Sequence, residues 1–304
     1  MATSKEEGPP APDLKQAESD GWGDTMASWR APGSDGRGAS SVIYMREVDL
    51  VNHLRPTRES PGLTVFVCTR NSEATLEKCL LSISRSEPHV KIVVIDQSSV
   101  DGTVEIARRL GAEVISHNIG LGYARQLGFD MCKTEHLAFV DSDEEIIQPR
   151  FFDVAIGILE DPTAGAVVGM SAGHRFAYGL PMGLLVLRAK DFQGRIIPSS
   201  INAREEFYVR RRLRSMGLSV VFVSGAMIHR SQYRRYKPEW EGANTRVVAG
   251  FDVGQLVFTA QVVLLQSLNS RSPKNLAYTP LFYLKFLRGF IQPWKWRILR
   301  QTNE

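Results

Sequence analysis

Long apolar runs are missing from this chain of 304 residues. No stretch of about 18 consecutive apolar residues is present, which is near the shortest length with which a helix crosses a bilayer. The segment 251–268 comes nearest, but Asp252 and several glutamines interrupt it. The N-terminus also lacks the apolar segment of a secretory signal. We therefore expect no transmembrane span and no signal peptide, and we predict a cytoplasmic protein.

Cysteine is scarce as well, with three residues, Cys68, Cys79 and Cys132. Their number is odd, and their spacing does not match that of metal ligands. All three lie in apolar or helical contexts, which is typical of buried free thiols in a reducing compartment. No internal repeat is visible.

Positive charge is present but unevenly placed, with a net charge of +4. Basic residues crowd the segment 204–237 and return in 285–300. Such clusters indicate anionic partners, which are phosphates, nucleic acid or an anionic membrane surface, although a solvated helix face explains some of them. Nothing else in the chain supports nucleic-acid binding, so we predict none.

Composition divides the chain into three parts. Residues 1–60 are rich in Gly, Pro, Ser, Ala and charge, and we expect them to be disordered, with 42–54 as the one exception. Residues 61–250 form the predicted main domain, and 251–304 form a helical extension in which basic and aromatic residues alternate. Its segment 281–299 is typical either of a helix at a membrane surface or of a core-packing helix.

Strand and helix patterns alternate through the first half of the main domain. Short apolar runs predict strands at 63–68, 91–95, 113–116 and 136–140, and amphipathic patterns predict helices at 73–85, 99–110 and 120–131. Further strands are expected at 166–170, 183–187 and 219–223, with a helix at 204–216. Repeated strand–helix units imply an α/β fold with a mostly parallel central sheet flanked by helices, Rossmann-like in its nucleotide-binding half.

Polar residues follow three of these strands at their carboxyl ends, and ligands of such sheets bind beyond those ends. They are the turn 69–71, Asp96, and the pair Asp141 and Asp143. Two carboxylates two residues apart at a strand end suit Mg²⁺ or Mn²⁺, with a diphosphate completing the shell. Glu144 and Glu145 follow at once, and either a divalent cation or exposure to solvent would relieve the repulsion among these four acids.

Five stretches, in this order, resemble the family 2 glycosyltransferases, which have the GT-A fold. They are 67–73 (VCTRNSE), 93–103 (VVIDQSSVDGT), 118–126 (NIGLGYARQ), 139–143 (FVDSD) and 205–206 (EE). Each is weak alone, and the ordered set is specific. A dinucleotide-binding loop does not explain 120–122, because Arg125 occupies its third glycine position and the stretch does not follow the first strand.

The resemblance implies a nucleoside diphosphate sugar as donor, carrying uridine or guanosine. It assigns donor binding to Thr69, Arg70, Asn71, Glu73, Asp96, Ser98, Gly122, Arg125, Asp141 and Ser142, and metal binding to Asp141, Asp143 and His229. Alternatives stay open for several of these residues. Glu73 is equally explained as an acid in the first turn of a helix, and Gly122 as a turn glycine. Arg125 is alternatively a partner in a surface ion pair. Asp141 either binds the metal through water or holds the ribose. His229 is either a metal ligand or structural.

The same resemblance implies an inverting transfer in which a carboxylate removes the proton of the acceptor hydroxyl. Glu206 takes the usual base position, normally an aspartate, and Glu205 is the alternative; both are otherwise a helix N-terminal acid pair. Tyr208 stands where many relatives have a second aspartate, so the acceptor is left as a glycan or a lipid-linked molecule. A sugar nucleotidyltransferase-like enzyme and an inactive nucleotide-sugar binder remain the alternative functions.

Overall fold

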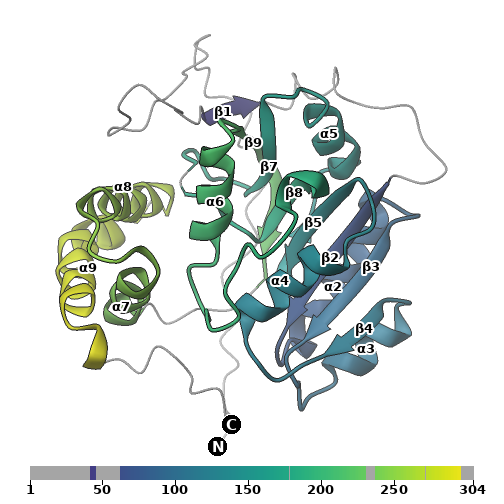
Figure 1. Ribbon diagram of the computed structural model, residues 1–304, viewed down its shortest axis with the longest axis horizontal. Helices are drawn as coiled ribbons and strands as arrows, with labels where there is room; N and C mark the ends of the chain where they lie inside the picture. The colour runs from purple at the N-terminus through teal and green to yellow at the C-terminus, as the bar shows by residue number, and fades with distance from the viewer. Residues whose placement is uncertain (1–41, 46–61, 178, 231–236, 271, 296–304) are drawn as a thin grey trace, which may run out of the picture.

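The computed structural model describes residues 42–45, 62–177, 179–230, 237–270 and 272–295. Within these ranges nine strands form one sheet, in the order β1-β9-β7-β8-β5-β2-β3-β4, with β6 paired to β9 off this path (Figure 1). The strands are β1 Val42–Met45, β2 Leu63–Thr69, β3 Lys91–Asp96, β4 Glu113–Ser116, β5 His136–Asp141, β6 Glu144–Ile146, β7 Ala164–Ser171, β8 Leu184–Arg188 and β9 Ser219–His229. Most of the predicted disordered segment lies outside the described residues.

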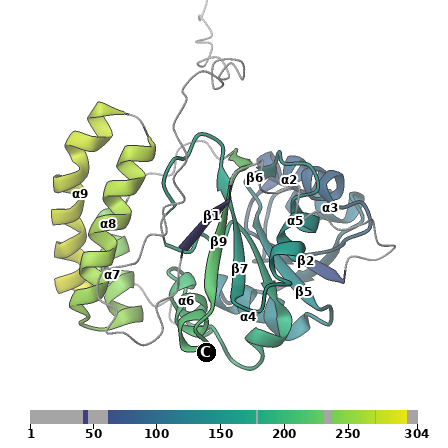
Figure 2. The ribbon, with the colours of Figure 1, turned by 90° about the horizontal axis from the view of Figure 1, so that it is seen from above.

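Helices cover both faces of this sheet. They are α2 Glu73–Ser86, α3 Thr103–Arg109, α4 Leu121–Met131, α5 Phe151–Ile158, α6 Glu206–Ser215, α7 Pro238–Ala249, α8 Val253–Asn269 and α9 Pro273–Ile291, with short 3₁₀ turns at Ala189–Phe192 and Pro293–Lys295. One apolar core joins α2, α3 and α5 to the sheet, and a second joins α4 and α6 to its other face. Figure 2 shows α7, α8 and α9 as a group beside this layered body. No helix of the described ranges is both long and apolar enough to cross a membrane.

The predicted α/β class with a mostly parallel sheet is confirmed. Strands β2, β3, β4 and β5 pair in parallel, and β8 runs antiparallel to both β5 and β7. These parallel strands are buried on both faces, as is usual for parallel sheets; in β2, Val65, Phe66 and Val67 have no exposed surface. The three cysteines are free, as predicted, although Cys68 and Cys132 are half-buried.

Strand β9 is longer than the predicted 219–223. The sequence Ser224-Gly225 resembles a turn, and Gly225 does adopt a positive φ of 68°. The strand nevertheless continues to His229, because its second half pairs with β6 and with Ser171 of β7 across a register shift. This extension places His229 opposite Glu144.

Helix α7 packs against α9 through a close approach of their backbones. A Cβ atom on Gly242 would overlap the carbonyl oxygen of Phe286, and one on Gly289 would overlap that of Glu239. The predicted boundary between 250 and 251 stays a prediction, but this packing favours a helical unit that begins at Pro238. Polar contacts join the unit to the main domain: Arg204 to Glu241, Arg210 to Gln255, and the backbone of Arg175 and Phe176 to Asn269.

We expect Gly289→Ala to lower the free energy of unfolding by about 1–3 kcal/mol, because the added methyl group has to push two packed helices apart. Denaturation by urea measures the loss. Gly254→Ala is the matched control, since the Cβ there meets just one flexible side-chain atom, at 3.2 Å. Alanine is the better helix former, so the control should be neutral or stabilising. Equal stabilities for both variants would mean that the helices do not cross at these glycines.

Candidate functional site

The carboxyl ends of three neighbouring parallel strands meet at one edge of the sheet. Thr69 of β2 is in register with Asp96 of β3, and Cys68 of β2 is in register with Asp141 of β5. The turn after β2, Asp96 and the acids after β5 are therefore brought together, as the strand pattern predicted.

Asp96 is buried at this edge, with 1% of its surface exposed. Its Oδ1 accepts hydrogen bonds from the hydroxyls of Thr69 at 2.9 Å and Ser99 at 2.5 Å, and its Oδ2 accepts from the backbone N–H of Ser99 at 2.9 Å. A carboxylate held by three donors is a fixed acceptor. Its contact with a donor nucleotide stays a prediction.

Two loops above Asp96 are bonded to each other. Asn71, with a positive φ of 51°, donates its backbone N–H to Ser99 Oγ at 2.8 Å, and its Oδ1 accepts from the N–H of Val100 at 3.0 Å. Glu73 Oε2 accepts from the N–H of Gly102 at 3.0 Å, at the start of α3. Glu73 also lies in the first turn of α2, and a contact between Glu73 and the donor stays a prediction.

The remaining predicted donor residues of these loops lie on their exposed side. Arg70 and Ser98 are exposed, and Ser98 Oγ donates to the carbonyl of His117 at 2.8 Å. Ser142 Oγ lies 2.8 Å from Ser72 Oγ, which links the loop after β5 to the loop after β2. These contacts hold the three loops at fixed distances from each other.

Arg125 is fully buried between two acids. Its Nη2 donates to Asp141 Oδ1 at 2.5 Å, its Nε lies 4.0 Å from Glu205 Oε1, and its guanidinium stands 4.8 Å from the ring centre of Phe139. Burial acts to lower the pKa of Arg125, but the neighbouring Cys68, Asp141 and Glu205 outweigh it and raise that pKa. Arg125 therefore remains a cation that fixes Asp141 and places Glu205 beside it.

The two predicted bases differ in environment. Burial, together with the charge of Glu206, raises the pKa of Glu205 to about 7, against the opposing effect of Arg125. The Glu206 side chain is 30% exposed, and its Oε1 lies 3.7 Å from Nη1 of Arg204. Arg204 in turn pairs with Glu241 of α7 at 2.5 Å. Glu205 thus faces the sheet edge and Glu206 faces the helical unit.

Asp143 and His229 come together although they lie far apart in sequence. Asp143 Oδ2 is 3.5 Å from His229 Nε2, and His229 Nδ1 is 3.9 Å from Glu144 Oε1. One carboxylate and one imidazole fit Mn²⁺ or Mg²⁺ that takes its other ligands from phosphate oxygens and water. No cluster of three or more His, Cys, Asp or Glu side chains suited to a metal ion occurs in the described part of the chain.

Arginines relieve much of the repulsion in the acidic run 141–145. Glu145 pairs with Arg85 at 3.1 Å and with Arg230 at 2.7 Å, and these hydrogen bonds lower its pKa against the raising effect of burial. Asp141 is paired with Arg125. The arginines thus act in addition to the two expected effects, a divalent cation and solvent, to which the Asp141 side chain is 34% exposed.

Gly120 and Gly122 have a structural reason to be glycines. A Cβ atom on Gly120 would overlap the side-chain oxygen of Asn202, and one on Gly122 would lie 2.5 Å from the carbonyl oxygen of Ile201. The backbone N–H of Gly122 donates to that same carbonyl at 2.8 Å. The close approach at Gly122 is made by the segment that leads to Glu205, and a contact with the donor stays a prediction.

His117 is a residue of this edge that sequence reasoning missed. Its backbone N–H donates to the carbonyl of Asp96 at 2.9 Å, and its Nε2 is buried without a hydrogen-bond partner among the described residues. Burial lowers its pKa, against the raising effect of Asp96. Its position just before the stretch 118–126 was the available signal.

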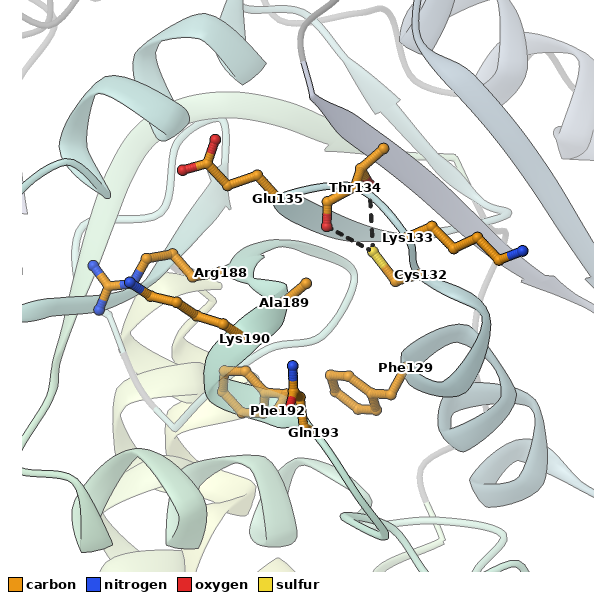
Figure 3. A pocket seen from close by; sticks show the side chains of 10 residues that line it. All are labelled: Phe129, Cys132, Lys133, Thr134, Glu135, Arg188, Ala189, Lys190, Phe192 and Gln193. Atoms are coloured by element: carbon orange, nitrogen blue, oxygen red, sulfur yellow. Dashed lines mark hydrogen bonds between the residues drawn. The ribbon is translucent and has the colours of Figure 1, made fainter.

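A pocket of about 290 Å³ lies elsewhere, and Figure 3 shows its lining. It is formed by the segment before β5 and the segment after β8, and its polar residues include Lys133, Glu135 and Lys190. None of its ten lining residues is a predicted site residue. Because β5 begins there and ends at Asp141, this pocket belongs to the opposite edge of the sheet.

Comparison with known proteins gives a consistent result. The family model described as Glycosyl transferase family 2 matches residues 64–236, more than half of the chain. A 4,4'-diaponeurosporenoate glycosyltransferase of Staphylococcus haemolyticus is 34% identical over 100 residues, which are 30% of this chain and 27% of that protein. An uncharacterized glycosyltransferase of Rickettsia bellii is 35% identical over 136 residues, 44% of this chain and 42% of that protein. The match therefore spans less than half of either relative.

Solved structures show the same fold at low sequence identity. The mannosyltransferase PcManGT of Pyrobaculum calidifontis, in complex with GDP-Man and Mn²⁺, has a TM-score of 0.57 at 14% identity, over 81% of this chain and 92% of that chain. Glucosyl-3-phosphoglycerate synthase of Mycobacterium tuberculosis, in complex with Mn²⁺ and UDP-glucose, has a TM-score of 0.50 at 18% identity, over 68% and 84%. The layered α/β body is that of the GT-A structures.

Proposed function

The chain belongs to glycosyl transferase family 2, and from this premise we propose that it transfers a sugar from a nucleoside diphosphate donor to an acceptor hydroxyl, with inversion at the anomeric carbon. One observation carries the proposal. Asp96, Asp141 and Glu205 come from three separate segments and are joined at one sheet edge through registered strands and through Arg125, with Asp143 two residues after Asp141 and Glu206 next to Glu205 in the chain. Sugar transfer needs a donor-nucleotide site, a metal site and a base within the length of one donor molecule, and this edge supplies residues for each role.

Donor binding rests on Asp96 and the loops above it. The fixed carboxylate of Asp96 is suited to accept the ring N–H of uracil or guanine, and leaving that N–H unpaired would cost affinity. Thr69, Asn71, Arg70, Ser98, Glu73 and Gly122 remain the other proposed contacts. The neighbours of similar fold hold GDP-mannose and UDP-glucose, which supports a UDP- or GDP-sugar here.

A divalent cation is part of the proposal, with Asp143 and His229 as the residues that would hold it. When bound, such an ion offsets the negative charge that grows on the departing nucleoside diphosphate. Glu144, beside His229 Nδ1, orients the imidazole so that Nε2 faces Asp143. Asp141 stays in the proposal as a ligand through water or as a ribose contact.

The acceptor is a hydroxyl of a glycan or of a lipid-linked molecule, and Glu206 or Glu205 removes its proton. We place the protein in the cytoplasm, which its three free thiols support, and at a membrane face through its C-terminal helices.

Thermal denaturation with a panel of nucleoside diphosphate sugars tests the donor and the metal together. A ligand present at about 100 times its dissociation constant adds about 2.7 kcal/mol, so we expect one UDP- or GDP-sugar to raise the melting temperature by about 5 °C or more when Mn²⁺ or Mg²⁺ is present. Chelator should abolish the shift.

Asp143→Asn should remove the metal-dependent part of the shift. Glu113→Gln is the matched control, because Glu113 opens β4 at the opposite sheet edge and pairs there with exposed Lys91. An equal shift in chelator would remove the metal from the proposal, and no shift with any donor would contradict donor binding.

A further inference from the structure

Helix α8 leaves a row of apolar side chains exposed. Val253, Val257, Leu264 and Leu268 are between 38% and 64% exposed, and their spacing of four, seven and four residues places them along one side of the helix. The opposite side of α8 is occupied, since Thr259 and Val263 are buried. The row is therefore an outward face, hereafter the α8 row.

Helix α9 has a second such row. Leu281, Leu284 and Ile291 are 47%, 63% and 59% exposed, at spacings of three and seven residues. Its other side carries Phe282, Phe286 and Phe290, which are buried. Two neighbouring helices that each keep three or four large apolar residues in solvent form an exposed surface that monomeric soluble proteins seldom show.

Charge on these helices has one sign. No aspartate or glutamate occurs from Val253 to Asn303. Helix α8 itself carries no charged residue, and the basic residues of this stretch follow it, at Arg271, Lys274, Lys285, Arg288, Lys295, Arg297 and Arg300. Arg288 lies one turn after Leu284 along the α9 row, so cations stand among the exposed apolar side chains.

We propose that the α8 row and the α9 row bind the surface of an anionic phospholipid bilayer. Apolar side chains that enter the acyl boundary, next to cations that meet anionic headgroups, are the combination that such a surface recognises. A second copy of this chain is a poorer occupant, because the cations of α9 would meet those of the other copy and the stretch from Val253 to Asn303 offers no acid to pair with them. In this proposal the helices lie along the bilayer surface, since no helix of the described ranges is both long and apolar enough to cross it.

This surface extends the predicted membrane contact, which was confined to 281–299. Helix α8 contributes four apolar residues and α9 three, and the Asp252 that interrupts the sequence pattern of α8 is its N-cap, accepting from the N–H of Gln255. The inference does not rest on sugar transfer, because lipid binding needs no donor.

Sedimentation of the full-length protein with vesicles tests it. We expect binding to phosphatidylcholine vesicles that contain about one third phosphatidylserine, at least about tenfold weaker binding to pure phosphatidylcholine, and loss of binding in about 0.5 M salt. The double variant Leu284→Glu and Ile291→Glu should bind the anionic vesicles about tenfold or more weakly, since two apolar contacts are lost and two repulsive charges added.

Leu81→Glu is the matched control, because Leu81 is a 45% exposed leucine on α2 of the main domain. It should bind vesicles as the unchanged protein does. Equal binding to neutral and anionic vesicles would overturn the anionic specificity. Absence of vesicle binding would overturn the proposal. This holds if the protein is a monomer, and also if it is a dimer that the double variant dissociates. Donor-induced stabilisation of the double variant should be unchanged, so a failure here leaves the transferase proposal standing.

Discussion

Replacing Arg125 by methionine is expected to lower the free energy of unfolding by about 3–5 kcal/mol, because the change leaves the buried Glu205 and the part-buried Asp141 without their cation. Asp141 loses its 2.5 Å partner, and Glu205, already short of solvent, loses the positive charge that favours its ionised form. Methionine fills most of the volume of the arginine side chain, so the loss reports the charge and not a cavity. Urea denaturation of the purified variants measures it.

Two further variants separate the causes. Arg125→Lys keeps a cation but not the planar fork, so we expect an intermediate loss. Arg108→Met removes an exposed arginine from α3 and should change stability by less than about 0.5 kcal/mol. A loss below about 1 kcal/mol in Arg125→Met would show that Asp141 and Glu205 do not depend on this cation.

Arg125 also shows how far sequence reasoning reached at the site. The stretch 118–126 identified the residue, and the two expectations were a diphosphate contact or a surface ion pair. The ion pair is present, but it is buried, with 1% of Arg125 exposed. Burial follows from the loop 196–205 closing over the start of α4, where Gly122 bonds to Ile201. A long-range contact of this kind leaves no local pattern in either segment.

The first half of the fold was predictable because each strand there is a continuous apolar run and each helix has a regular apolar stripe. Leu76, Leu80 and Ile83 of α2 are buried, as their spacing indicated, whereas Leu81, expected in the same stripe, is 45% exposed. Helix α5 and strand β6 were not predicted. Strand β6 has three residues, of which two are glutamates, and it exists because β9 continues past its expected end to pair with it. The existence of strand β6 and the length of β9 are therefore determined by pairing between distant segments and not by local composition.

The metal-binding prediction depended on the same long-range pairing. Asp143 and His229 are neighbours because β9 reaches His229 opposite Glu144. The sequence-based explanation for the four neighbouring acids did not include Arg85 and Arg230, which pair with Glu145. Arg85 belongs to α2, and Arg230 is the residue after β9. Their assignment required the fold.

Glutamine in place of the catalytic base is expected to lower turnover by about 10²–10⁴-fold, the usual contribution of general base catalysis. The structure separates the two candidates by environment. Glu205 is buried beside Arg125, with a pKa raised to about 7, whereas Glu206 is partly exposed beside Arg204. Release of nucleoside diphosphate from the stabilising donor, followed across pH, measures both variants.

The pH profile tells which glutamate is the base. A base acts when deprotonated, so if Glu205 has this role the rate rises as pH increases through about 7, and Glu205→Gln removes both that rise and most of the rate. If Glu206 has the role, Glu206→Gln loses the rate and Glu205→Gln keeps it. Donor-induced stabilisation should survive in both variants, because neither side chain is a proposed donor contact. Retention of more than about one tenth of the rate in both would place the base elsewhere, since no general base contributes so little.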